Sequence, residues 1–249
     1  MDRKVVIVGV LSLLLVSSFS KEKSEAAISV STGNDVVINQ RTATKENAQE
    51  MDNQINIIRK HYTKGYLSVD YPQLSGGDVD KEKTINSVIA KEATYFFENG
   101  FYEGYSGDIK YKTTFLSDEV VSFTYQGLIT SPIQSYPVHL FYSTIINMKT
   151  GKKETLSDLV TIDDTFVKAF KEGEILSISS SEYTYEVKEY ISTLSNEELL
   201  HLFSQADKMD ISSAFTYLTA DSIVVAIGVP HALGDFIQIE IPKNKIHHN

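Results

Sequence analysis

The chain has 249 residues, of which 42% are hydrophobic and 10% aromatic, and it carries a formal net charge of −10. This length allows one large domain or two small ones, and the apolar content excludes a chain that is disordered throughout. The acidic charge excludes nucleic acid and anionic membrane surfaces as favourable partners and favours cationic proteins, although acidic surfaces also serve solubility. The absence of cysteine excludes disulfides, thiol catalysis and a lipid anchor on a thiol.

Residues 1–27 are typical of a signal peptide. Two basic residues precede an apolar run at 5–19, which is shorter than the roughly 20 residues that span a bilayer. Small residues allow cleavage after Ser20, Ala26 or Ala27. We therefore expect an extracellular protein, or one on the cell-wall side of the membrane. An uncleaved N-terminal anchor is the alternative, and it would be the only contact with the membrane.

Residues 28–52 are polar and predict a flexible linker, after which residues 53–134 predict a first subdomain. A long helix is the clearest element of this subdomain. Its apolar side chains recur every three or four residues between a cap at Asp78 or Asp80 and a stop at Asn99-Gly100. Two strands before the helix and a hairpin after it are expected at 55–59, 64–71, 108–116 and 119–128.

Residues 135–249 predict a second subdomain. The stretch Val138–Met148 is apolar on both alternating faces, which predicts a central strand that continues the hairpin as an antiparallel meander. Short helices are expected near Thr165 and after the capping box that opens at Ser195. Three closing strands are expected at 214–218, 223–229 and 236–241, the last at a sheet edge because Pro242 ends it.

Together these elements predict an α+β fold. We expect antiparallel sheets, one long amphipathic helix and several shorter helices, arranged as two packed subdomains.

Three stretches of the sequence resemble a known pair of extracytoplasmic bacterial domains of unknown function. They are YLSVDYPQLSG with the following TINSVIAKEA, YPVHLFYSTIINMKTGKKETLSDLV, and DSIVVAIGVPHALGDFIQIEIPKNKI, and the resemblance covers residues 66–246. Such domains form the outer region of RsiV, an anti-sigma factor that acts as a lysozyme receptor, and the non-catalytic region of a peptidoglycan deacetylase. The resemblance implies a ligand-binding module on the wall side. Because four residues precede the apolar run and the chain ends at Asn249, we expect neither sigma control nor deacetylation.

No stretch of the sequence carries a recognisable catalytic motif. Residues 161–164, TIDD, are similar to the metal-binding aspartates of such deacetylases, but that chemistry also needs two histidines spaced on one helix. No pair among the six histidines has this spacing, so we interpret Asp163 and Asp164 as a helix cap. The segment from Gly104 to Gly107 lacks the G-x-S-x-G pattern of a serine nucleophile. We therefore expect no enzymatic activity, no catalytic residue, no metal and no cofactor.

Tyrosines supply the candidate binding residues, since the chain has 14 tyrosines and no tryptophan. Exposed tyrosines stack on sugar rings or anchor protein interfaces, and four of them fall in segments expected to be loops. With two residues of the turn before the last strand, the candidates are Tyr102, Tyr105, Tyr183, Tyr185, His231 and Asp235. The alternative is that the tyrosines cap the outer face of a sheet.

The sequence predicts a secreted, cell-envelope-associated binding module. Its expected partner is a cationic protein such as lysozyme, or peptidoglycan. A wall-modifying carbohydrate hydrolase that uses an unmarked pair of carboxylates is the alternative.

Overall fold

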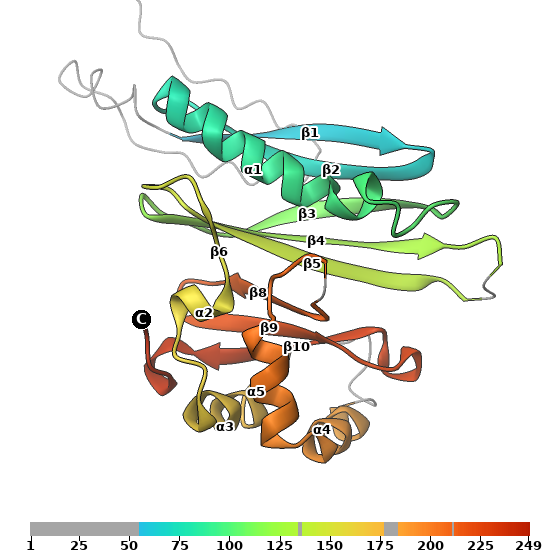
Figure 1. Cartoon of the computed structure of the whole chain (residues 1–249), viewed down its shortest axis with the longest axis vertical. Helices are drawn as coiled ribbons and strands as arrows, with labels where there is room; N and C mark the ends of the chain where they lie inside the picture. The colour runs from blue at the N-terminus through green and yellow to red at the C-terminus, as the bar shows by residue number, and fades with distance from the viewer. Residues whose placement is uncertain (1–54, 134–135, 177–183, 211) are drawn as a thin grey trace, which may run out of the picture. The chain divides into compact units, whose positions relative to one another are not determined.

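The computed structural model describes residues 55–133, 136–176, 184–210 and 212–249 (Figure 1). All of these residues belong to one structural unit of the chain. The predicted signal peptide at 1–27, the predicted linker at 28–52 and Tyr183 lie outside the described residues.

The first sheet has six strands in chain order. They are β1 (Asn56–Lys64), β2 (Tyr66–Ser75), β3 (Ser106–Leu116), β4 (Val120–Thr130), β5 (Val138–Asn147) and β6 (Lys153–Glu154). Only β2 and β3 run parallel, because the helix α1 (Val79–Glu98) connects them, and every other neighbouring pair is antiparallel. The predicted hairpin and its continuation as an antiparallel meander through β5 are confirmed.

Helix α1 forms where the sequence predicts it. The side chain of Asp78 accepts a hydrogen bond of 2.9 Å from the backbone N–H of Lys81, and this cap satisfies one of the free donors of the first turn. One stripe of α1, with Ile85, Ile89 and Ala93, is fully or almost fully buried against the first sheet.

The second sheet has four strands in the order β7-β10-β9-β8. These strands are β7 (Glu174–Leu176), β8 (Ala214–Leu218), β9 (Ser222–Gly228) and β10 (Phe236–Pro242). Short helices pack on it through a second apolar core (Figure 1), and they are α2 (Leu156–Leu159), α3 (Asp164–Lys171), α4 (Thr184–Thr193) and α5 (Asn196–Ser204). Single turns of 3₁₀ helix, η4 (His231–Leu233) and η5 (Lys243–Lys245), flank β10. The predicted α+β fold class is confirmed.

Strand β5 holds the two sheets together. Its Tyr142 hydroxyl donates a 2.6 Å hydrogen bond to the backbone carbonyl of Ala93 in α1, on one face of the sheet. On the other face, the Ser143 hydroxyl donates a 2.6 Å hydrogen bond to the carbonyl of Thr216 in β8. Because β4 and β5 pair in the first sheet, this sheet contains residues of both expected subdomains.

Strand β5 lies inside the first sheet, between β4 and β6, as predicted, although β6 pairs only with Ile145 and Ile146. Its two faces are covered by α1 and by the second sheet. Two expectations are wrong in detail. Strand β10 is not an edge, because the three-residue strand β7 pairs with it and ends short of Pro242. Tyr185 lies on helix α4 rather than in a loop.

Candidate binding site

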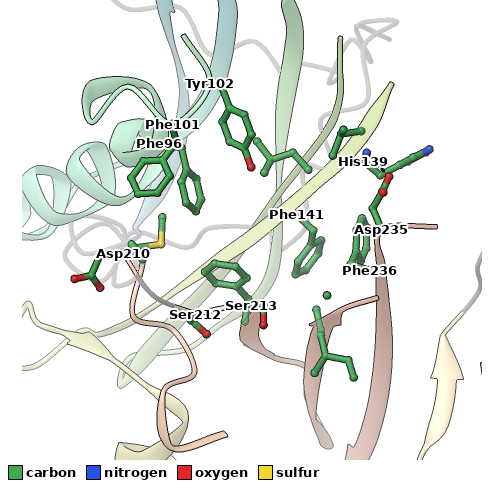
Figure 2. Close-up of a pocket in the computed structure, with 17 residues that line it drawn as sticks. Phe96, Phe101, Tyr102, His139, Phe141, Asp210, Ser212, Ser213, Asp235 and Phe236 are labelled. Carbon is green, nitrogen blue, oxygen red and sulfur yellow. Dashed lines mark hydrogen bonds between the residues drawn. The ribbon is translucent and has the colours of Figure 1, made fainter. Parts of the chain in front are cut away.

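An open pocket of ≈ 450 Å³ lies where the end of α1, the start of β5 and the second sheet meet (Figure 2). Six aromatic side chains line it: Phe96, Phe101, Tyr102, Phe141, Phe215 and Phe236. Its volume falls within the range of ligand pockets, and its lining is mostly apolar with a few polar groups, so we take it as the candidate site.

The turn after α1 forms the first wall. Gly100 and Gly104 have φ values of 73° and 81°, which other residues adopt only with strain, so these glycines fold the chain back on itself. This turn holds Phe101 against Phe96, with ring centroids 5.5 Å apart, and leaves the Phe101 side chain half exposed. It also places Tyr102 in the pocket, and the ring centroids of Tyr102 and Tyr105 lie 5.4 Å apart.

Asp235 forms the opposite wall. It has a φ of 71°, a left-handed conformation that aspartate adopts more readily than most residues. Its Oδ2 accepts a 2.8 Å hydrogen bond from the backbone N–H of His139 at the start of β5, and its Oδ1 lies 2.8 Å from His231 Nδ1. Asp235 therefore ties the β9–β10 turn to β5, and these two contacts hold its side chain beside the pocket.

The electrostatic character of the pocket is acidic. Asp210 and Asp235 lie on opposite sides of it (Figure 2), and the described residues that line it include no lysine or arginine. Burial, followed by the neighbouring Tyr105, raises the pKa of the Tyr102 hydroxyl, so this group stays a neutral donor at physiological pH. The pocket thus combines aromatic surfaces with two carboxylates.

The structure brings four of the six candidate residues to this pocket. Tyr102 and Asp235 line it, Tyr105 contacts Tyr102, and His231 contacts Asp235. Tyr185 lies elsewhere, exposed on α4, and Tyr183 lies outside the described residues.

Sequence reasoning missed the phenylalanines and Asp210. Phe96 belongs to the apolar stripe of α1, and Phe141, Phe215 and Phe236 lie in strands, so the local pattern assigns all four to a core. Only Phe101, in the glycine-rich turn beside Tyr102, carried a signal that could have identified it.

No family model matches the sequence, and no curated protein matches it. Among solved structures, the fold is similar to a DUF3298 family protein from Pseudomonas aeruginosa, with 10% identity and a TM-score of 0.45 over 77% of this chain and 91% of that one. It is also similar to a DUF3298 family member from Bacteroides fragilis, with 12% identity and a TM-score of 0.45 over 79% of this chain and 93% of that one. The resemblance to RsiV and to the deacetylase stays a prediction.

Among the described residues, no group of three or more His, Asp or Glu side chains is placed to hold a metal ion. Asp163 caps helix α3 through a 2.9 Å hydrogen bond from the backbone N–H of Phe166, as the sequence predicts. The helices of the described region include none long and apolar enough to span a membrane.

Proposed function

We propose that this chain is an exported binding module of the cell envelope, without enzymatic activity, and that it binds a cationic protein through the aromatic pocket. Lysozyme is the first candidate partner. The observation that carries the proposal is the composition of the pocket wall, which joins six aromatic side chains to two carboxylates.

A lysine or arginine side chain of the partner fits this wall. A cation over an aromatic face gains about 0.5–1 kcal/mol when exposed and about 2 kcal/mol or more when desolvated. The negative charge of Asp235 is not cancelled within the pocket by a lysine or arginine, since its described partners are a backbone N–H and a histidine ring nitrogen. A cation entering the pocket therefore meets both a carboxylate and aromatic side chains.

The formal charge of −10 supports the same partner class over longer distances. It should speed encounter with a basic protein, and salt should weaken this steering because the Debye length is about 10 Å at 0.1 M.

Calorimetry with lysozyme at two salt concentrations tests the proposal. Phe101→Ala and Tyr102→Ala should each weaken binding by about 1–3 kcal/mol, mainly through faster dissociation. Tyr66→Ala is the matched control, because Tyr66 is a highly exposed tyrosine on β2 that does not line the pocket. An absence of heat at low salt would remove lysozyme as the partner. Binding that neither Phe101→Ala nor Tyr102→Ala weakens would place the site outside the pocket.

A wall-modifying carbohydrate hydrolase is the second candidate. Two carboxylates on opposite sides of a pocket with aromatic walls favour it, because aromatic rings stack on sugars and paired carboxylates catalyse glycoside hydrolysis. Incubation with labelled peptidoglycan separates the two candidates. The hydrolase should release soluble fragments, and Asp210→Asn should abolish that release, whereas the binding module should release none.

A further inference from the structure

In the part of the chain that the structure describes, the outer edge of β5 is unpaired where it borders the pocket. Strand β4 pairs with the inner edge along the whole of β5, from Val138 to Asn147. On the outer side β6 pairs only with Ile145 and Ile146, and no other strand of the described region reaches β5 there. The residues at the free end of this edge, from Val138 to Phe141, line the pocket.

The alternation of an antiparallel strand decides which backbone groups face outward. The N–H of Asn147 donates to Lys152 on the β6 side, and the N–H of His139 donates to Asp235, so the odd-numbered residues of β5 point away from β4. The N–H and C=O of Phe141 and the C=O of His139 therefore point toward the outer edge. The N–H of His139 also points outward, but it already donates to the carboxylate of Asp235, which takes the place of a strand carbonyl.

Strand β8, at one edge of the second sheet, has its outward backbone groups hydrogen-bonded by side chains. The outward N–H of Thr216 donates to Asp207 Oδ1 over 2.7 Å, and its C=O accepts from Ser143 Oγ over 2.6 Å. The N–H of Leu218 donates to Ser122 Oγ over 2.9 Å. Side chains thus satisfy the edge of β8 residue by residue, whereas among the described residues a side chain bonds the outer edge of β5 only at His139.

We propose that an extended segment of a basic polypeptide pairs with the N–H and C=O of Phe141 and with the C=O of His139 on β5, and places a lysine or arginine side chain in the aromatic pocket. Unpaired strand edges bind extended peptides in this way, with backbone hydrogen bonds supplying affinity and a pocket supplying selectivity. The inference rests on the proposed function, since it specifies how the partner uses the same pocket.

Charge selects the occupant. The described lining offers Asp210 and Asp235 but no lysine or arginine, so an acidic segment would meet repulsion and a basic one attraction. Peptide rather than glycan is inferred for this edge because the outward groups of Phe141 and His139 repeat the donor and acceptor spacing of a β-strand.

The probe for the experiment is a blocked pentapeptide, Thr-Val-Arg-Val-Thr, acetylated at its N-terminus and amidated at its C-terminus. Two further versions carry a single N-methyl group, one on the arginine and one on the following valine. Only alternate residues of a paired strand direct their N–H toward the neighbour, so one methylated version should bind about tenfold more weakly and the other like the parent. Amide hydrogen exchange followed by NMR should slow at Phe141 with the parent peptide and stay unchanged at Leu140, whose N–H points toward β4.

The outcomes separate this inference from the proposed function. Equal affinities of the two methylated versions, or unchanged exchange at Phe141 in a saturated complex, would overturn strand pairing while leaving the pocket as a side-chain site. A parent peptide that does not bind at millimolar concentration would also overturn it. The lysozyme calorimetry with Phe101→Ala and Tyr102→Ala tests the pocket independently of either result.

Discussion

The Oδ1 atom of Asp207 accepts a 2.7 Å hydrogen bond from the backbone N–H of Thr216, and this contact seals the edge of β8. The Oδ2 atom of the same carboxylate accepts from the backbone N–H of Leu156 at the start of α2, over 2.9 Å. The backbone carbonyl of Asp207 accepts from the Lys153 ammonium, which also pairs with Glu92 of α1. One buried residue therefore connects β8, α2, β6 and, through Lys153, helix α1.

Replacing Asp207 should destabilise the protein. In Asp207→Asn an amide NH₂ replaces one carboxylate oxygen, so the N–H of Thr216 or of Leu156 loses its acceptor in a buried site, at a cost of about 1–3 kcal/mol. Asparagine also adopts positive φ readily, so the backbone at Asp207, with a φ of 65°, adds little strain. Chemical denaturation measures the loss, and Asp118→Asn, in an exposed turn, should change the free energy of unfolding by less than about 0.5 kcal/mol. Equal stabilities of wild type and Asp207→Asn would show that Asp207 does not hold the β8 edge.

The same carboxyl should make stability depend on pH. Burial raises the pKa of Asp207 from 3.8 to about 6, because the hydrogen bonds from Thr216 and Leu156 only partly offset desolvation. Between these two pH values the Asp207 carboxyl is protonated in the folded chain and ionised in the unfolded chain. Because the folded chain binds one more proton, the free energy of unfolding falls as pH rises from about 4 to about 6. A shift of this size corresponds to about 2–3 kcal/mol.

Wild type minus Asp207→Asn isolates this effect, since the other titrating groups are common to both proteins. The difference in free energy of unfolding should fall between about pH 4 and about pH 6 and then stay level. These two limits are the pKa values of Asp207 in the unfolded and in the folded chain. A difference that does not change with pH would place the pKa of Asp207 near its ordinary value.

The contact of β3 with β4 depends on Gly127. A Cβ atom at this position would lie 2.2 Å from the carbonyl oxygen of Asp108 and 2.7 Å from Ile109 Cδ1. Because Asp108 O is a backbone atom in a paired strand, Gly127→Ala should force the strands apart and cost at least about 1–3 kcal/mol, the usual range for overpacking. Thermal or chemical denaturation measures the effect, and Gly77→Ala, which would meet no atom within 4 Å, is the control. Comparable stabilities of the two variants would contradict the close approach of β3 and β4.

Local sequence signals account for much of the fold and little of the site. The periodicity of α1 and its cap at Asp78 depend on neighbouring residues alone, so both could be predicted. The three-residue strand β7 has no pattern of its own, and for this reason the interior position of β10 was missed. Phe96 and Phe236 are far apart in the sequence, and each has the pattern of a core residue. They line a pocket because the end of α1, the start of β5 and the second sheet leave a gap where they meet. This gap is a result of tertiary packing, which no local sequence pattern contains.

Two stacked tyrosines of the first sheet provide a matched pair for the last prediction. The rings of Tyr125 and Tyr142 are parallel within 14° with centroids 4.8 Å apart, and both side chains are fully buried. The Tyr142 hydroxyl donates a 2.6 Å hydrogen bond to the carbonyl of Ala93 in α1. The Tyr125 hydroxyl lies beside the side chain of Thr144 and makes no hydrogen bond of normal geometry among the described residues. Tyr142→Phe should therefore cost about 1–2 kcal/mol, because α1 loses a buried bond to the sheet. Tyr125→Phe removes a poorly satisfied buried hydroxyl with almost no change in shape, so it should cost less than Tyr142→Phe. Both variants keep the stacked rings, so the difference between their free energies of unfolding reports the hydroxyl groups alone. Equal losses would mean that the contact of Tyr142 with Ala93 contributes nothing to holding α1 on the sheet.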